Sequence, residues 1–272
     1  MKNTHARMMT NLDAIDVVLR HPRVVFNRLR IIASNRHFRR EREGWLSRLT
    51  GILSQNVRRS IAEVEHDKEF LDAVRDAYRR NTSYFPFPTD FMTEANGRTL
   101  FFHCVSLYAL IRLVKPQVVV ETGGTPGKSS AFILRAMQQN KQGTLYTIDL
   151  PPPPTIAALS PGETHAFRPM GLPSNWAVPE ILRFLQHLVL GPAQIHLPNL
   201  LRQLGQVDAF IHDSDHSHQH MLWELRTAYP FVRSGGYLWA DDALANSAWT
   251  EFCDEVGLTP CNFTSQGVTL KK

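Results

Sequence analysis

Hydrophobic residues recur at helical spacing in the early part of the chain. These stripes predict two short helices, over residues 12–19 and 25–32, and a further helical stretch over 61–78. Pro22 suits the first turn of the second helix. The prolines within 84–88 resist helix continuation, so we expect a loop there.

From residue 98 the pattern changes to an alternation of strands and helices. A helix over 100–114 precedes a β-rich run at 118–120, a glycine-rich turn and a helix over about 129–139. Further strands are predicted at 145–148, 194–197, 209–211 and 237–240, with helices over 178–190 and 217–229. Residues 150–176 hold seven prolines and predict a long irregular connection.

This alternation predicts an α/β fold. We expect a Rossmann-like, doubly wound, mostly parallel sheet of seven strands with an N-terminal helical extension. The sequence shows no internal repeat, so we divide it once. Residues 1–97 would form a basic helical segment and cap, and residues 98–272 the α/β domain.

The net charge of +5 is unevenly distributed along the chain. Residues 1–60 hold 13 Lys and Arg against four Asp and Glu, whereas the remaining residues hold 17 against 21. A basic segment of this kind can attract nucleic acid or an anionic membrane surface. Solvated helix faces explain it equally simply, so the alternatives stay open.

The cysteines and the N-terminus bear on where the protein works. Cys104, Cys253 and Cys261 contain no CxxC pair, and an odd number argues against a disulfide framework or a zinc site. The first ten residues lack an apolar signal-peptide core, and no stretch approaches the ~20 apolar residues of a membrane span. We expect a cytoplasmic protein that touches membranes at most peripherally, through its basic N-terminus.

The glycine-rich turn after 118–120 is the first candidate site. From Glu121 to Ser130 it reads Glu-Thr-Gly-Gly-Thr-Pro-Gly-Lys-Ser-Ser. Glycines between a strand and a helix let the backbone approach a ligand closely. A phosphate-binding P-loop needs four residues between its first Gly and its Gly-Lys, whereas Gly123 leaves three before Gly127. The turn therefore predicts another nucleotide-type site, with a purely structural turn as the alternative.

Acidic residues follow three of the predicted strands. Asp149 comes 22 residues after Gly127, where doubly wound folds place an acid against ribose hydroxyls, although it could be a plain turn residue. Carboxylates also follow the strands ending near residues 212 and 240; these residues are Asp213, Asp215, Asp241 and Asp242. Parallel strands bring these ends to one edge, where clustered acids repel or share a cation such as Mg²⁺. Ordinary solvated loop acids are the alternative.

Three motifs can be read together: Glu121-Thr-Gly-x-x-x-Gly-x-Ser-Ser, Ile211-His-Asp-Ser-Asp-His216 and Gly235-Gly236-Tyr-Leu-Trp-Ala-Asp241-Asp242. Over residues 100–272 they resemble the class I S-adenosylmethionine-dependent methyltransferases that include the macrocin and mycinamicin sugar O-methyltransferases. The chain departs from that family where a Gly-Asp-Ser-like turn often follows the third strand, and has His196-Leu-Pro-Asn199 instead. The adenine contacts are therefore unassigned.

The resemblance implies the cofactors and the site residues. S-adenosylmethionine would contact Glu121, Thr122, Gly123, Gly127, Ser129, Ser130, Asp149 and Asp213. Mg²⁺ or another divalent cation would bind Asp213, Asp241 and Asp242. His216 would be the general base, with Asp213 as its catalytic partner, since neutral histidine accepts protons near pH 7. Alternatively, His212, His216, His218 and His220 form only a polar helix start.

The expected activity is methylation of a hydroxyl on a small molecule, such as the sugar of a natural product or a phenol. We expect a homo-oligomer. A nucleic-acid methyltransferase is the first alternative because of the basic N-terminus, but the (Asp/Asn)-Pro-Pro-aromatic motif common in base N-methylation is absent where Asp213 stands. The second is a non-catalytic scaffold that binds the cofactor or a membrane.

Overall fold

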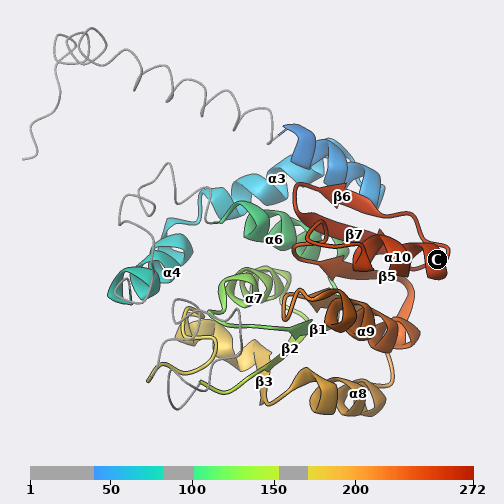
Figure 1. The fold of residues 1–272 in the computed structure, drawn as a ribbon. Coiled ribbons are helices and arrows are strands. Elements are labelled where there is room, and N and C mark those ends of the chain that lie inside the picture. Colours follow the sequence, from blue (N-terminus) through green and yellow to red (C-terminus); the bar gives the residue numbers. More distant parts are fainter. Residues whose placement is uncertain (1–39, 82–100, 153–170) are drawn as a thin grey trace, which may run out of the picture. The chain divides into compact units, whose positions relative to one another are not determined.

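The computed structural model describes residues 40–81, 101–152 and 171–272 (Figure 1). The chain divides into two compact units, Met1–Gly44 and Trp45–Lys272. In the first unit, residues 40–44 are helical.

Several expectations lie outside the described residues. These are the helices over 12–19 and 25–32, the loop at 84–88, the domain boundary near residue 98 and most of the irregular connection over 150–176. Among the described helices, none is long and apolar enough to cross a membrane.

Seven strands form one sheet in the order β3-β2-β1-β4-β5-β7-β6. Their bounds are β1 Val118–Thr122, β2 Thr144–Asp149, β3 Gln186–Leu190, β4 Val207–His212, β5 Val232–Ala240, β6 Cys261–Phe263 and β7 Gln266–Leu270. Strands β1 to β5 pair in parallel, and β7 pairs antiparallel with β5 and β6. The sheet confirms the expected doubly wound, mostly parallel, Rossmann-like fold.

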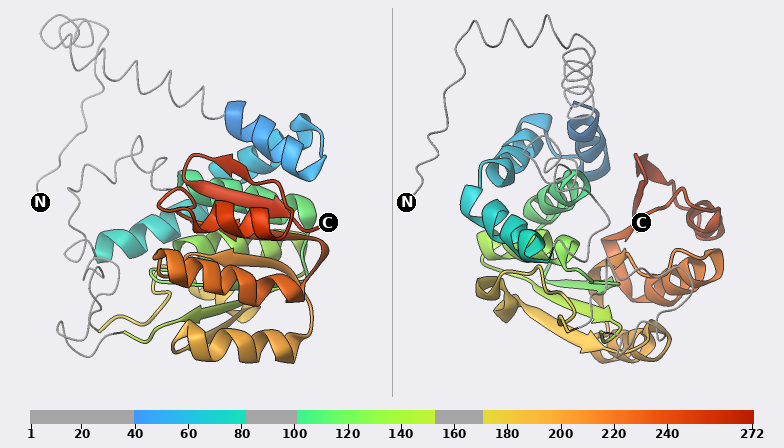
Figure 2. Two further views of the ribbon diagram at one scale, coloured as in Figure 1. Left: turned by 45° about the vertical axis from the view of Figure 1, so that its right-hand side comes forward. Right: turned by 60° about the vertical axis from the view of Figure 1, so that its left-hand side comes forward.

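Helices cover both faces of the sheet, as Figure 1 and the right-hand view of Figure 2 show. One layer holds α3 Ser54–Glu65, α4 Lys68–Arg80, α6 Phe102–Val114 and α7 Lys128–Asn140. The other holds α8 Ala193–Leu204, α9 His218–Ala228 and α10 Ala248–Glu255. Short 3₁₀ turns, η4 Glu180–Leu185 and η5 Tyr229–Phe231, precede β3 and β5. The expected helical stretch over 61–78 is therefore helical, but it breaks into α3 and α4.

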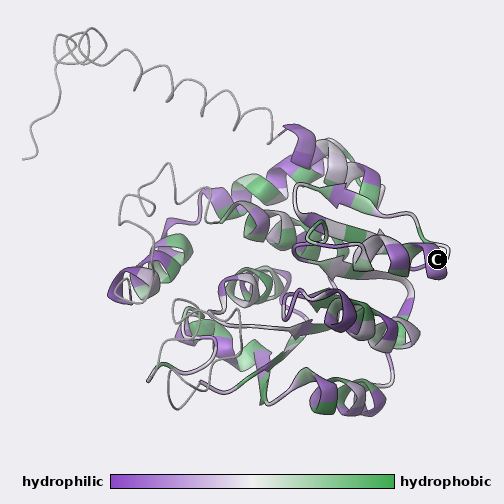
Figure 3. Ribbon diagram, viewed as in Figure 1, coloured by the Kyte–Doolittle hydropathy of each residue, from purple (hydrophilic) through white to green (hydrophobic). Residues whose placement is uncertain are grey.

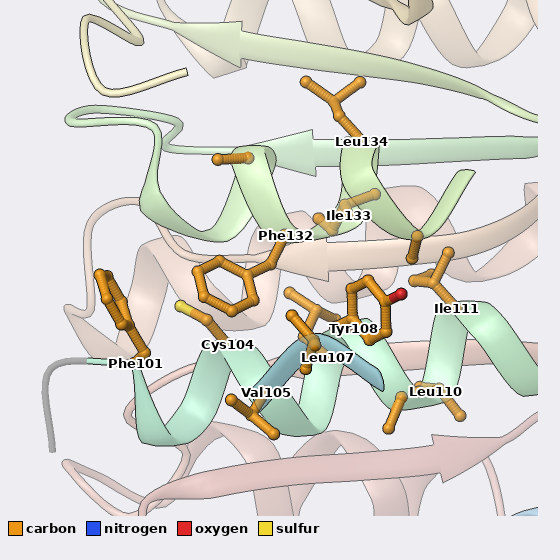
Figure 4. Packing of buried hydrophobic residues seen from close by; sticks show 14 of the residues in the cluster. Phe101, Cys104, Val105, Leu107, Tyr108, Leu110, Ile111, Phe132, Ile133 and Leu134 are labelled. Atoms are coloured by element: carbon orange, nitrogen blue, oxygen red, sulfur yellow. The ribbon is translucent and has the colours of Figure 1, made fainter. Parts of the chain in front are cut away.

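Two hydrophobic cores lie on opposite faces of the sheet, because successive strand residues point in opposite directions. In β1, Val119 belongs to the core beneath α6 and α7, whereas Val120 belongs to the core beneath α8 and α9. Figure 4 shows the first core, where Tyr108 and Ile111 of α6 face Phe132 and Ile133 of α7. Figure 3 shows hydrophobic residues, in green, on helices of both layers as well as in the sheet.

Two predicted elements are wrong. Residues 178–190, expected as a helix, form η4 and the edge strand β3, which pairs with β2. The periodicity of a short apolar run does not distinguish a helix from a strand. These residues form a strand because they pair with the otherwise free edge of β2. Residues 194–197, expected as a strand, lie in α8, where Leu197, Leu200 and Leu201 share one buried helical face despite Pro198. The residues that follow the third strand are consequently Gly191-Pro192 rather than His196–Asn199.

The order of the strands reverses beside β1, since the chain runs outward to β2 and β3 and then returns to β4 on the other side. Ligands of open α/β sheets bind at such a switch point, beyond the carboxyl ends of the strands. In the strand register Thr122 lies between Ile148 and His212, and His212 lies beside Ala240. The candidate site residues therefore emerge at one edge.

Candidate active site

The glycine turn joins β1 to α7 and is packed tightly on both sides. Gly123 donates its N–H to the Ile148 carbonyl at 2.9 Å and has φ of 81°. A Cβ added there would lie 2.0 Å from the Asp213 carbonyl oxygen. Gly127 caps α7 with φ of 99°, and a Cβ there would lie 2.9 Å from Asn175 Cα. Both positions therefore require glycine.

Glu121 anchors the turn from behind. Its side chain is fully buried and accepts hydrogen bonds from three hydroxyls, those of Ser129 at 2.6 Å, Ser130, and Thr147 at 3.0 Å. Burial raises the pKa of Glu121, although the three hydroxyls oppose that shift. The structure thus brings together three residues expected at the cofactor, but it turns their side chains toward one another. They fix the start of α7 against β1 and β2.

Asp149 lies beside the same turn, at the end of β2. Its carboxylate is almost fully buried and accepts hydrogen bonds from the Leu150 N–H at 2.9 Å and from the Thr125 hydroxyl. The Asp149 carbonyl accepts the Gly191 N–H at 2.8 Å, which joins the ends of β2 and β3. An acid at this place, next to a glycine turn and a helix N-terminus, fits the ribose of a nucleoside cofactor.

The next acidic residues are aligned by an extension of the sheet. Beyond the strands, the Asp213 N–H donates to the Thr122 carbonyl at 3.0 Å, and the Asp241 N–H donates to the His212 carbonyl at 2.9 Å. These bonds place Asp213 and Asp241 side by side. One ligand atom from each of Asp213, His216 and Asp241 lies within 4.8 Å of the others. The spacing suits a shared cation.

The electrostatics of this group favour a cation. Burial and the nearby charges of Asp241 and Glu121 raise the pKa of Asp213 well above its ordinary value. Burial and His212 lower the pKa of His216, and three neighbouring carboxylates only partly offset this. Carboxylate oxygens suit Mg²⁺ or Mn²⁺, whose charge would relieve the repulsion between Asp213 and Asp241. The residues present fit a divalent metal.

Asp242 lies at the rim of the group. Its side chain is 52% exposed, its Oδ2 is 3.9 Å from His216 Nε2, and its φ is 47°. His216 Nε2 is equally 3.9 Å from Asp213 Oδ1. The three ligand atoms that converge most closely therefore include His216 in place of Asp242, which the sequence had suggested as the third ligand.

Glu224, a buried residue of α9 that contacts the ends of β1 and β4, is not predicted from the sequence. Its carboxylate accepts hydrogen bonds from Thr122, His212, Ser214 and His220. One signal could have revealed it, because Glu224 interrupts an apolar stripe formed by Met221, Leu225 and Ala228. A carboxylate on a buried helix face requires compensating donors.

Comparison with known proteins places the site in context. A protein family described as methyltransferase domain matches residues 120–243, whereas no curated protein has a significant match. Among solved structures, the chain is similar to the SAH-bound methyltransferase PaMTH1 of Podospora anserina, with 15% identity over 74% of this chain and 88% of that chain, and a TM-score of 0.49. The O-methyltransferase TomG of Streptomyces achromogenes, in complex with SAM, has 16% identity over 76% and 91%, with a TM-score of 0.46. The stretch that holds the glycine turn and the acidic group is therefore similar in sequence to a methyltransferase domain.

Proposed function

We propose that this chain is an S-adenosylmethionine-dependent O-methyltransferase that acts on a hydroxyl group of a small molecule, such as a sugar or a phenol. The observation that carries the proposal is the convergence of Asp213, His216 and Asp241 within 4.8 Å, beside the glycine turn. The match of residues 120–243 to a methyltransferase domain supports the methyl donor. Asp149 would hold its ribose.

Asp213 and Asp241 would hold a divalent cation, with Asp242 reaching it from the rim. A cation there would lower the pKa of the acceptor hydroxyl. His216 would accept the hydroxyl proton, since its lowered pKa leaves it neutral near pH 7. S-adenosylmethionine would supply the methyl group: the acceptor oxygen would bond to the methyl carbon as the carbon–sulfur bond breaks, and S-adenosylhomocysteine would leave as a neutral thioether. The fixed turn would align donor and acceptor, which supplies much of the acceleration.

The test uses S-adenosylmethionine with a labelled methyl group and a panel of sugar and phenol acceptors. We expect transfer that EDTA stops and Mg²⁺ restores. Asp241→Asn should weaken Mn²⁺ binding and lose activity, whereas Asp254→Asn, which changes an exposed acid on α10, should change neither. Full turnover in EDTA would overturn the role of the metal.

A second pair of measurements separates the two roles open to His216. If it is the base, His216→Ala should retain Mn²⁺ binding, followed by electron paramagnetic resonance, and lose methyl transfer. Equal loss of Mn²⁺ binding in His216→Ala and Asp241→Asn would make it a ligand instead.

A further inference from the structure

One buried carboxylate connects the two halves of the candidate site. Glu224 is fully buried in α9. Its Oε2 accepts the Thr122 hydroxyl at 2.6 Å and His212 Nδ1 at 2.6 Å. Its Oε1 accepts the Ser214 hydroxyl at 2.9 Å and His220 Nε2 at 2.9 Å. All four partners of this carboxylate are side chains.

The positions of these donors along the chain are informative. Thr122 is the last residue of β1 and directly precedes Gly123. His212 is the last residue of β4 and directly precedes Asp213, and Ser214 directly follows Asp213. The carboxylate of Glu224 therefore holds the residue before the cofactor turn and both neighbours of a candidate metal ligand.

The carboxylate is ionised and its donors are thereby oriented. Burial alone would raise the pKa of Glu224, but hydrogen bonds from His212 and His220 outweigh burial and lower it to about 2. An ionised carboxylate only accepts hydrogen bonds, so the His212 Nδ1 carries a hydrogen. The His212 ring then stands perpendicular to that of His216, with their centroids 5.4 Å apart. Glu224 thus sets the ring against which His216 packs.

We propose that Glu224 is a positioning residue that fixes the cofactor turn and the 213–216 loop relative to each other. The proposal rests on the proposed function of that site. Glu224 is fully buried and acts through Thr122, His212 and Ser214. Loss of a group that hydrogen-bonds a metal ligand directly commonly lowers metal affinity about 10- to 100-fold. Glu224 bonds the two neighbours of Asp213, so we expect the lower end of that range.

The chain offers a matched control at the opposite ends of the same strands. Asp208, at the start of β4, accepts the N–H groups of Gln117 and Val118, each at 2.8 Å, and the guanidinium of Arg233. It therefore joins β1, β4 and β5 as Glu224 joins β1, β4 and α9, but away from the site. Asp208→Asn therefore measures the effect on stability and ligand binding of losing a structural carboxylate away from the site.

The experiment compares Glu224→Gln with Asp208→Asn and the wild type. Calorimetry with S-adenosylhomocysteine, electron paramagnetic resonance with Mn²⁺ and urea unfolding are measured on each full-length protein. We expect Glu224→Gln to weaken both ligands by about 10-fold or more, and Asp208→Asn to leave both within about two-fold. Equal affinities in Glu224→Gln and wild type, or equal losses in the two variants, would overturn the proposal.

Milder variants keep the test decisive if Glu224→Gln fails to fold. Thr122→Val removes the donor next to the turn and should mainly weaken S-adenosylhomocysteine, whereas Ser214→Ala removes the donor next to Asp213 and should mainly weaken Mn²⁺. Unchanged binding of both ligands in both variants would overturn the proposal. A wild type that binds neither ligand would contradict the proposed function itself, so the two failures are distinguishable.

Discussion

Replacing Gly123 with alanine tests whether the turn is shaped by the close approach of β4. Two costs add at this residue. Its φ of 81° lies in the left-handed region, where a residue with a Cβ costs roughly 1–2 kcal/mol. The added Cβ would also lie 2.0 Å from the Asp213 carbonyl oxygen and 2.5 Å from Ser214 Cα, both in the backbone, so neither can rotate away. Overpacking of this kind typically costs another ~1–3 kcal/mol.

Gly257→Ala is the matched control for this substitution. Gly257 has φ of 66°, but nothing lies within 4 Å of its added Cβ, so only the backbone cost applies. We therefore expect Gly257→Ala to lose roughly 1–2 kcal/mol in urea unfolding and Gly123→Ala roughly 2–5 kcal/mol. Only Gly123→Ala should also weaken S-adenosylhomocysteine and Mn²⁺. Equal stability losses and unchanged binding in both variants would refute the packing of Asp213 against the turn.

Three further predictions concern stability and reactivity. The pKa of Glu224 in the folded protein is about 2, below the ordinary 4.5. Ionised Glu224 therefore contributes about 3 kcal/mol to the free energy of unfolding above pH 4.5, and this contribution is lost as the pH falls from 4.5 to 2. In urea unfolding, the difference in stability between the wild type and Glu224→Gln should narrow from pH 7 to pH 3. Arg112 pairs with Glu63 at 3.0 Å and holds α3 to α6, so Arg112→Met should cost about 1–2 kcal/mol in urea unfolding and leave S-adenosylhomocysteine affinity unchanged. Burial raises the pKa of Cys104 and of Cys253 to about 12, so at pH 8 both thiols should react with Ellman's reagent only after urea is added.

Much of the candidate site could be predicted because its residues follow short apolar strands directly in sequence. Asp149 is the last residue of β2, Asp213 and Asp241 come immediately after β4 and β5, and parallel pairing brings all three to one edge. Sequence spacing could not show which side chains of the glycine turn hydrogen-bond one another. The Ser130 hydroxyl donates to the Glu121 carboxylate, and this contact depends on the packing between β1 and α7.

Other parts depend on partners distant in sequence. The third strand was mistaken for a helix because its apolar run is short and the deciding factor is the unpaired edge of β2. Glu224 lies 102 residues after Thr122, to which it binds, and no local pattern shows that the two meet. The ligand atom of His216 lies within 4.8 Å of those of Asp213 and Asp241. The side chain of Asp242, the residue after Asp241, is 52% exposed.

The most direct test of the central claim is calorimetric titration of S-adenosylhomocysteine into the wild type and into Asp149→Ala. Asp149 is held by Leu150 and Thr125 beside the glycine turn, and it is the acid expected to bind the ribose. We predict saturable binding of one molecule per chain in the wild type and an affinity at least about 10-fold lower in Asp149→Ala, through loss of hydrogen bonds to a charged group. Absence of binding to the folded wild type, or equal affinity in both proteins, would contradict a methyl-donor site at this edge of the sheet.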